Sequence, residues 1–509
     1  MLKKALLICI LMSIFISYAD AKDRDSSIGQ IVVYLKGFYK PSLDITFNLT
    51  AMNLVAKNGE IIEIMNTPLK INSMAVAGNQ ILIAEKLLPT GKYKKIQFII
   101  KEAEIKRQKE ISNLALPSII EVDIDITIRE NKCSSLFLVW NPDASFIEGY
   151  FFKPFFTVRY ETPQLSTTAI YVTNEESNNI TVIDRHLDEV VATIMVGKNP
   201  RGIATSLSKE HVRVYVANAG SDSISVINPL INDVENEIPL KFGAKPEAIT
   251  VSSAFYGKEL IFVANYGSNT VSIFDASTYQ QIEEINVGNG PIAIAADPPV
   301  DIIQQSKFLS FEEVNLWKDY RKRYLNVYVA NKNSKNVSIL KMDILRNKVQ
   351  EVINIEVGWS PVALFLDYHR GKLYVANYDS DELSVIDILE IIKGNKASIK
   401  SITNIGVSIS GVVSDDEFDR IYLLKNSEVL VIKPLSEISG LTKTIHALTI
   451  ESVKVGKSPS SLIIDPEGRK LYVVNRDSNS VSVIDKTTRK QIKIIPVCKK
   501  PYYIAIFPF

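Results

Sequence analysis

A two-part repeat runs through residues 166–509 and limits the possible folds more than any other feature. Each copy has an aromatic-valine-x-asparagine segment and, further along, a glycine-x-x-proline segment. Successive aromatic positions lie 44 to 50 residues apart, apart from one interval of 66. This period is close to the roughly 40–50 residues of one four-stranded propeller blade, a unit that cannot bury its apolar faces alone. The first segments of the seven copies start at Tyr171, Tyr215, Phe262, Tyr328, Tyr374, Tyr422 and Tyr472.

The rest of each repeat has the composition of short strands and turns. Polar residues such as Ser221–Ser223 follow the asparagine, and Asn, Asp and Ser favour turns because they bond their own backbone. A β-branched run with one small residue comes next, as in 481–484, and a further strand follows each proline. Short β-branched runs at this regularity predict an all-β array. Two turns depart from the pattern, since Ile409 stands where proline is expected and Cys498 stands where glycine is expected.

The ends of the array predict how it closes. The first repeat lacks the strand that follows proline in the other repeats, and the chain ends on such a strand at 502–507. Together the two ends complete one blade, which predicts a closed seven-bladed β-propeller. Closure leaves no long strand edge exposed. An open solenoid is the alternative, but it needs distinct capping repeats, and the sequence contains none.

These segments resemble those of the YVTN-repeat family, the surface-layer-type and YncE-like β-propellers of bacterial and archaeal surfaces and periplasms. The resemblance covers about two-thirds of the chain. It implies the propeller architecture and an extracytoplasmic setting. It implies no catalytic residue, because the family shares a structural repeat and no catalytic motif.

Residues 1–21 have the composition of a signal peptide. Lys3 and Lys4 precede an apolar run from Ala5 to Tyr18, and small residues at positions 19 and 21 predict cleavage after Ala21. The run is shorter than the ~20 residues that cross a bilayer. We therefore expect a secreted, periplasmic or cell-surface protein whose mature chain has no transmembrane segment.

Charge and cysteine content narrow the partners. The chain has 58 basic and 57 acidic residues, which argues against a general nucleic-acid binder. Cleavage of the signal peptide would leave Cys133 and Cys498. A disulfide is one possibility, but Cys498 falls in a turn expected at the channel mouth, far from the N-terminal domain. We expect two thiols.

Residues 25–162 lack the repeat and form a separate predicted domain. Alternating apolar and polar residues predict an antiparallel β-sandwich. The segment Leu88–Ile96 resembles the LPAGxYxxIRL turn of small exported β-sandwich domains of unknown function, which implies no catalytic residue. A short linker, Glu161–Ser166, follows. The predicted strands are 31–35, 44–54, 81–83, 96–100, 119–128 and 136–140.

The turns at the channel mouth hold the candidate ligand site. In a propeller the strand after each proline is innermost, so the glycine-proline turns surround the mouth, where loops on a rigid scaffold concentrate binding residues. Lysines on neighbouring turns predict a basic crescent with Trp359 across from it. It is either ordinary solvated surface or a site for an acidic glycan or phosphate-bearing cell-wall polymer. The candidate residues are Lys198, Arg201, Lys245, Trp359, Lys457, Lys499, Lys500 and Tyr502.

The long repeat interval contains a predicted helix. Ser310 and Glu313 form a capping box, and Phe311, Val314, Trp317 and Tyr320 or Arg321 follow at helical spacing. We expect this helix on the face opposite the channel mouth, where Trp317 packs against the N-terminal domain or covers the ring.

Catalytic motifs are missing from the sequence. The histidines His186, His211, His369 and His446 show no metal-ligand spacing, and neither Cys-x-x-Cys-His nor Gly-x-Ser-x-Gly occurs. The acidic run 415–419 lacks the calcium-loop pattern and is expected to be solvated surface. We therefore expect no catalytic residue, metal or cofactor.

Two functions remain in view. The first is a non-catalytic binding or scaffold protein of the cell envelope, whose partner is an envelope polymer or a surface protein. The alternative is a lactonase-like, metal-dependent hydrolase that uses Glu247 and Asn289 at the channel mouth. The sequence leaves the ligand and the oligomeric state open.

Overall fold

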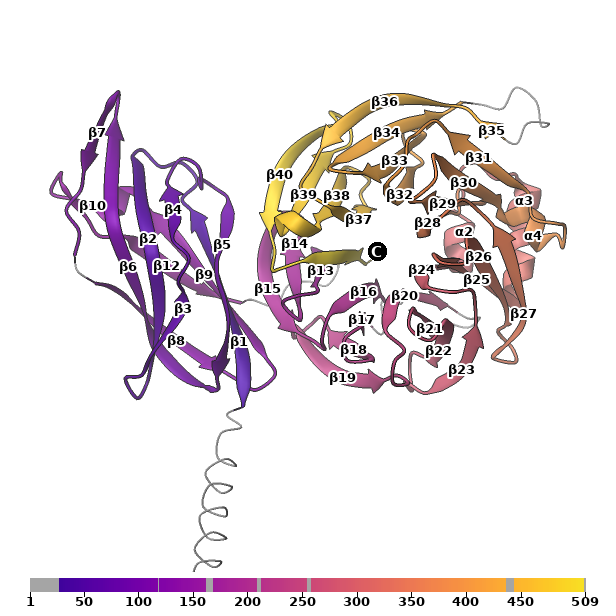
Figure 1. Cartoon of the computed structure of the whole chain (residues 1–509), viewed down its shortest axis with the longest axis horizontal. Coiled ribbons are helices and arrows are strands. Elements are labelled where there is room, and N and C mark those ends of the chain that lie inside the picture. Colours follow the sequence, from indigo (N-terminus) through magenta and orange to yellow (C-terminus); the bar gives the residue numbers. More distant parts are fainter. Residues whose placement is uncertain are drawn as a thin grey trace, which may run out of the picture. The chain divides into compact units, whose positions relative to one another are not determined.

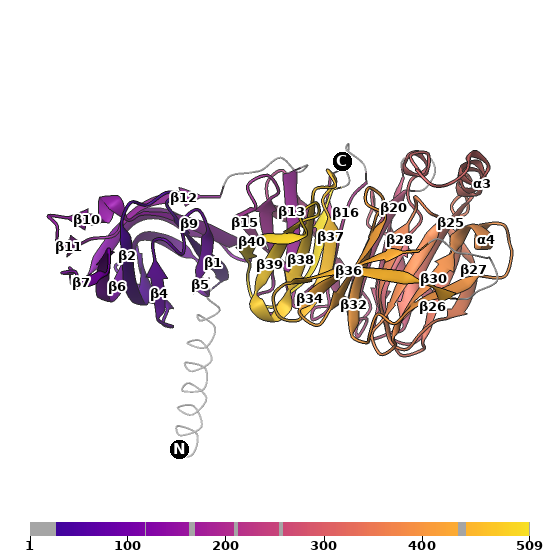
Figure 2. The same ribbon diagram turned by 90° about the horizontal axis from the view of Figure 1, so that it is seen from above.

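The computed structural model describes residues 27–507 apart from 118, 162–167, 208–211, 254–257 and 436–443. The chain divides after Glu161 into two compact units (Figures 1 and 2). The predicted signal peptide 1–21 and His211 lie outside the described residues, as does most of the predicted linker. In the described part of the chain, no helix has both the length and the apolar character needed to cross a membrane.

The first unit consists of two β-sheets. They are antiparallel except for the pair of β1 with β9. One sheet has the order β12 (Phe155–Tyr160), β9 (Cys133–Asn141), β1 (Ile28–Gly37) and β5 (Gln80–Pro89). The other has the order β3 (Ile61–Met65), β2 (Asp44–Ala56), β6 (Gly91–Arg107) and β7 (Glu110–Asn113), with β4 (Leu69–Asn72) on β2 and β8 (Ile120–Ile128) on β6. A short hairpin, β10 (Phe146–Ile147) and β11 (Phe151–Phe152), follows the single-turn helix η1 (Asp143–Ser145).

The two sheets pack face to face through alternate residues of their strands. Phe47 of one sheet meets Trp140 of the other edge to face at 4.9 Å, and Phe98 stacks on Phe156 at 4.7 Å. The Trp140 indole N–H, which burial would otherwise leave unbonded, donates to the Ser145 hydroxyl at 3.1 Å. The period-2 pattern thus produces the predicted sandwich, because one face of each strand enters a shared apolar core.

The second unit is a ring of seven sheets, numbered here as blades 1 to 7 from the sheet that holds both ends of the unit (Figure 1). From the innermost strand outward, blade 1 consists of β41 (Pro501–Ile506), β13 (Ala169–Asn174), β14 (Asn179–Asp184) and β15 (Glu189–Met195). Blade 2 consists of β16 (Pro200–Thr205), β17 (Val214–Asn218), β18 (Ser223–Asn228) and β19 (Asp233–Pro239). Blade 3 consists of β20 (Pro246–Ser253), β21 (Glu259–Asn265), β22 (Thr270–Asp275) and β23 (Gln281–Asn286).

Blades 4 to 7 repeat this order. Blade 4 consists of β24 (Pro291–Ala296), β25 (Tyr324–Asn331), β26 (Asn336–Asp343) and β27 (Lys348–Glu356), and blade 5 consists of β28 (Pro361–Asp367), β29 (Lys372–Asn377), β30 (Glu382–Asp387) and β31 (Ile399–Thr403), extended by β35 (Thr444–Ile445). Blade 6 consists of β32 (Ile409–Asp415), β33 (Arg420–Lys425), β34 (Glu428–Pro434) and β36 (Ala447–Lys454). Blade 7 consists of β37 (Pro459–Ile464), β38 (Lys470–Asn475), β39 (Ser480–Asp485) and β40 (Lys490–Pro496).

Strands from the two ends of the unit close the ring in blade 1. β41 pairs antiparallel with β13, and Tyr171 lies opposite Ala505. Phe507 packs against the Tyr171 ring edge to face at 5.9 Å. The predicted closure is confirmed, and it makes the first and last strands of the unit neighbours.

The asparagine and the glycine of the repeat fit against each other. The Asn218 amide nitrogen donates to the hydroxyls of Ser223 (3.2 Å) and Ser225 (2.8 Å), which fastens the hairpin between the two middle strands of the blade. A Cβ on Gly197 would lie 2.6 Å from this amide, so the turn that packs over it needs glycine. In blade 6 Lys425 replaces the asparagine, and its ammonium donates to the Ile405 carbonyl at 2.8 Å instead.

Three short helices belong to blades 4 and 5: α2 (Val300–Ile303), α3 (Phe311–Arg321) and α4 (Ile388–Ile392). The capping box of Ser310 and Glu313 forms as predicted. Trp317 is fully buried within the ring unit, in a cluster that includes Tyr328 and Leu389. Helix α3 therefore covers part of the ring, and Figure 2 shows that it projects at the ends of the blades.

The acidic run 415–419 only partly matches the predicted solvated surface, because the side chains of Glu417 and Asp419 are 59% and 52% exposed whereas Asp415 is buried. Asp415 is 1% exposed and forms an ion pair with the equally buried Lys486 of blade 7 at 2.9 Å. Asp416 pairs with Lys307, and Asp419 pairs with Arg370 at 2.7 Å. The pattern of the run does not reveal these ion pairs, because all three cations come from other blades or connections. The described cysteines, Cys133 and Cys498, are both thiols, as expected.

Candidate functional site at the channel mouth

The glycine-proline turns and the asparagine hairpins meet on one face of the ring. The Gly220 N–H of a hairpin donates to the Lys198 carbonyl of a turn at 2.9 Å, and the Ala219 N–H donates to the Asn199 carbonyl at 3.0 Å. Each turn joins an outermost strand to the innermost strand of the next blade, so the turns surround the channel mouth. The predicted assignment of turns and hairpins to one face is confirmed.

A cavity of about 760 Å³ lies at this mouth. Two positions of the repeat supply most of its lining. The residue after the turn proline, or after Ile409 in blade 6, lines it in six of the seven blades: Glu247, Ile292, Val362, Ser410, Ser460 and Tyr502. The residue after the hairpin asparagine, or after Lys425 in blade 6, lines it in four: Lys332, Tyr378, Asn426 and Arg476.

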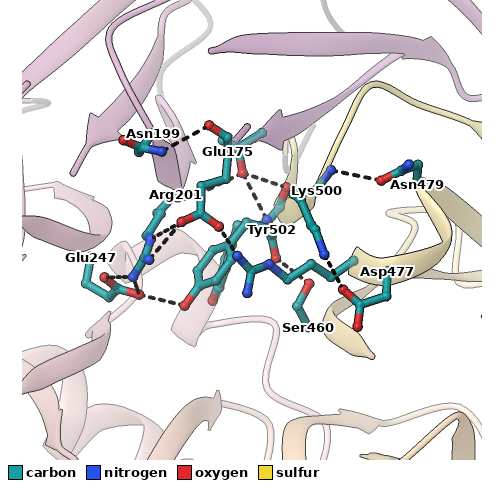
Figure 3. Close-up of polar contacts among 12 residues, drawn as sticks. Glu175, Asn199, Arg201, Glu247, Ser460, Asp477, Asn479, Lys500 and Tyr502 are labelled. Atoms are coloured by element: carbon teal, nitrogen blue, oxygen red, sulfur yellow. Dashed lines mark hydrogen bonds and ion pairs between the residues drawn. The ribbon is translucent and has the colours of Figure 1, made fainter. Parts of the chain in front are cut away.

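One side of the mouth holds a network of paired charges, here called the locked cluster: Glu175, Arg201, Glu247, Arg476 and Tyr502. Figure 3 labels all of these residues except Arg476. Arg201 donates to Glu247 at 2.5 and 2.7 Å and to Glu175 at 2.8 Å. Arg476 donates to the other oxygen of Glu175. The Tyr502 hydroxyl donates to Glu247 at 2.6 Å, and both guanidinium groups lie over its ring at 5.1 and 5.5 Å.

Burial strengthens this network. The Glu247 side chain is only 4% exposed. Burial alone would lower the pKa of Arg201, but Glu247, Tyr502 and Glu175 outweigh it and raise that pKa. Burial, followed by the charge of Glu247, raises the pKa of Tyr502, so the phenol keeps its proton and donates it. Two arginines balance two glutamates, and the cluster as a whole is neutral.

Ion pairs neutralise two members of the predicted basic crescent, Arg201 of the locked cluster and Lys500. Arg201 and Tyr502 belong to the cluster, and the Lys500 ammonium pairs with Asp477 at 2.8 Å (Figure 3). The prediction overlooked Glu175 and Asp477, the carboxylates that neutralise these groups. Glu175 follows Asn174 directly, so comparison of the residue after the asparagine in every repeat would have found it.

The other predicted residues lie around the mouth without meeting at one point. Lys198, Lys245, Lys457 and Lys499 are exposed on four turns, and within the described residues no ion pair engages their ammonium groups. Lys457 alone of these four lines the cavity. Trp359 is 58% exposed beside the cavity, with the Lys335 ammonium over its ring.

The side of the cavity in blades 4 to 7 has a different character and is here called the open arc: Lys332, Tyr378, Ser408, Asn426 and Lys457. Among the residues that the structure describes, no side-chain hydrogen bond or ion pair engages these five groups. They offer two ammonium groups, two hydroxyls and an amide to the cavity. Lys332, Tyr378, Ser408 and Asn426 were not predicted, although three of them occupy the same repeat position as Glu175.

The hydrolase alternative depends on Glu247 and Asn289 as metal ligands. Glu247 already accepts hydrogen bonds from Arg201 and Tyr502. Asn289 is exposed on a turn outside the cavity lining, where its N–H donates to the Ser334 hydroxyl at 2.6 Å. The described residues contain no group of three or more His, Cys, Asp or Glu side chains placed to hold a metal ion.

Comparisons with known proteins agree on the ring. No family model matches the chain. It is 22% identical over 324 residues to the seven-bladed beta-propeller protein Rv1057 of Mycobacterium tuberculosis, covering 60% of this chain and 76% of that protein. A functionally unknown protein from Desulfotomaculum acetoxidans matches 67% of this chain and 100% of its own at 11% identity, with a TM-score of 0.51. A protein from Lactobacillus plantarum matches 66% and 98% at 12% identity, with a TM-score of 0.50. At such identities the likeness shows the fold alone, and with the sheet order it establishes that the second unit is a seven-bladed β-propeller.

Proposed function

We propose that this protein is a non-catalytic, extracytoplasmic binding protein whose open arc holds an acidic glycan or a similar anionic polymer of the cell envelope. One observation carries the proposal: Lys332 and Lys457 line the same cavity, and no carboxylate among the described residues pairs with either. Two unpaired cations in a concave site attract an anion, because the low-dielectric walls focus their field.

The remaining groups of the cavity suit a sugar. Tyr378, Ser408 and Asn426 supply hydroxyl and amide groups that donate and accept hydrogen bonds, as a polyhydroxylated ligand requires. The cavity volume of about 760 Å³ falls within the range of roughly 300–1,000 Å³ that is typical of small-molecule sites. A carboxylate-bearing sugar residue therefore matches the mouth in charge, polarity and size.

The paired state of the acidic residues supports binding over catalysis. General acid–base catalysis most often uses an imidazole or a carboxylate that can exchange a proton with the substrate. Arg201 and Tyr502 hold Glu247, and Lys500 holds Asp477, so the two carboxylates that line the cavity are both engaged. His369, the most buried of the described histidines, contacts Asp416 and lies in the connection between β28 and β29, at the opposite end of β28 from its glycine-proline turn.

The setting of the protein is part of the proposal and rests on the sequence. Residues 1–21 have the composition of an export signal. The repeat resembles that of the YVTN-repeat family, whose members lie at the cell surface or in the periplasm. Neither unit needs a membrane span for this role. Attachment to the envelope follows from binding the polymer itself.

Calorimetric titration of the chain that starts at Lys22 with a galacturonic acid trimer tests the proposal. We expect the Lys332→Ala/Lys457→Ala variant to bind about 30-fold more weakly or worse, since each lost charge-assisted contact is worth about 1 kcal/mol or more. The matched control, Lys198→Ala/Lys499→Ala, removes the same charge outside the cavity and should change affinity less than about threefold, an effect that salt screens. Equal losses of affinity in the two double variants would refute the proposed function. So would an affinity for a neutral glucan trimer equal to that for the galacturonic acid trimer.

A further inference from the structure

The exposed indole of Trp359 lies beside the open arc and is tied to it by the backbone. The Asp379 N–H donates to the Trp359 carbonyl at 3.3 Å, and the Tyr378 N–H donates to the Ser360 carbonyl at 2.9 Å. The Ser408 N–H in turn donates to the Tyr378 carbonyl at 2.7 Å. Three neighbouring connections therefore place Trp359, Tyr378 and Ser408 in sequence, from outside the cavity lining to inside it.

Hydrogen bonds fix the backbone of this segment, although its aromatic groups face solvent. The Trp359 N–H donates to the Ser380 hydroxyl at 2.7 Å, and the Ser360 hydroxyl donates to Asp379 at 2.5 Å. Tyr378 is 41% exposed and Trp359 is 58% exposed. Tyrosine and tryptophan side chains have only two rotatable bonds, so they offer a large contact area at little cost in conformational entropy.

A further positive charge lies at the outer end of this segment. The Lys335 ammonium sits over the Trp359 ring, and Lys335 comes from the blade 4 hairpin that also carries Lys332. The same hairpin thus supplies one cation to the cavity and one to the indole. A cation at each end of the segment suits a ligand that repeats its negative charge along a chain.

We propose that the open arc and Trp359 form one continuous track for a chain of acidic sugars, an inference that rests on the proposed function. One sugar residue occupies the cavity, with its carboxylate between Lys332 and Lys457. The following residues run outward over Tyr378 to Trp359, whose rings stack on the apolar faces of the sugars. Lys335 meets a second carboxylate at the indole.

Chain length tests the track separately from the cavity. Galacturonic acid monomer, trimer and hexamer are titrated into the chain that starts at Lys22, and we expect the hexamer to bind at least about tenfold more tightly than the monomer. Trp359→Ala should lower hexamer affinity by about tenfold and leave monomer affinity unchanged, whereas Trp359→Phe should retain most of it. The matched control is Phe242→Ala, because Phe242 is 98% exposed on a turn between blades 2 and 3, away from the track.

Indole fluorescence gives a second readout that does not depend on affinity. The chain has three tryptophans, and Trp140 and Trp317 are both 0% exposed, so iodide should quench the fluorescence of Trp359. Protection from this quenching therefore reports that a ligand covers Trp359. The hexamer should shield it and the monomer should not. Monomer binding that depends on Lys332 and Lys457, combined with no effect of chain length or Trp359, would overturn the track and leave the proposed function intact. No binding of any of the three probes would overturn both.

Discussion

The two sides of the channel mouth are built from the same repeat positions and have opposite properties. The residue after the hairpin asparagine is Glu175 or Arg476 in the locked cluster, where each carboxylate and guanidinium has a partner. The equivalent residue is Lys332 or Tyr378 in the open arc, where the side chains have none among the described residues. The scaffold is common to both sides, so the difference lies in the side chains alone. A single propeller position can therefore serve either the ring or a ligand.

The locked cluster lies in and beside blade 1, where β41 and β13 come from opposite ends of the unit and are joined by hydrogen bonds alone. Glu175 follows β13, and Tyr502 lies in β41, the two strands that join the ends of the unit. Glu175 pairs with arginines from the two flanking blades, and Tyr502 bonds to Glu247 of blade 3. These contacts hold four consecutive blades together where loop-closure entropy must be overcome. The blades of the open arc contain no such break, because the four main strands of each come from one segment of the chain.

Removal of the closing strand should have the largest effect. Deletion of residues 501–509 takes away Tyr502 and the buried Ile504, Ile506 and Phe507, each worth about 1.5–3 kcal/mol. We expect a loss of about 5 kcal/mol or more in the free energy of unfolding, measured by urea denaturation. The control is Ile494→Ala on the exposed outer strand of blade 7. A deletion variant as stable as this control would show that the ring does not depend on its closure.

Single substitutions should separate the two sides next. Arg201→Ala leaves Glu247 and Glu175 without their shared partner, and removal of one member of a largely buried ion pair costs about 3 kcal/mol. Lys457→Ala in the open arc should change the free energy of unfolding by less than about 0.5 kcal/mol, because no group depends on it. Thermal and urea unfolding of the two variants measures the contrast. Equal stability losses would mean that the two sides do not differ in role.

Alkaline pH should give the smallest of the three effects. Burial and Glu247 raise the pKa of Tyr502 in the folded protein, so above about pH 10 the unfolded chain loses a proton that the folded protein keeps. Stability that is fully present below pH 10 is therefore lost as the pH rises, by up to about 1.4 kcal/mol per pH unit for each such tyrosine. The pKa of Tyr422 is likewise raised by burial to about 12.

Tyr502→Phe isolates the contribution of the locked cluster. Urea denaturation between about pH 9 and 11 should show a shallower loss of stability with pH in this variant than in the natural protein. The other buried tyrosines remain in both proteins and cancel in the comparison. Identical slopes would show that Tyr502 ionises as readily in the folded as in the unfolded chain.

The sequence predicts the ring well because its repeat encodes contacts within a blade. Asn218 reaches Ser223 and Ser225 at fixed separations, so the hairpin can be read from the pattern. Closure follows from the missing strand of the first repeat. The face that carries the turns follows from the alternation of strand direction.

The charge state of the mouth depends on contacts between blades, which the sequence does not reveal. Arg201 and Glu247 lie 46 residues apart, and Arg476 and Glu175 lie 301 apart, yet each pair is in direct contact. A lysine or arginine on a turn is equally consistent with a ligand site and with a paired charge. The buried pair of Asp415 and Lys486 is likewise a contact between two blades, so the sequence pattern does not reveal it.

A crystal structure of the protein with a bound galacturonic acid trimer tests the difference between the two sides most directly. The account predicts a carboxylate of the trimer between Lys332 and Lys457, with a sugar ring beside Tyr378 and the Arg201–Glu247 pair unchanged. A trimer bound at Arg201 with Glu247 displaced would contradict it, as would a mouth without bound sugar at a concentration that saturates the protein.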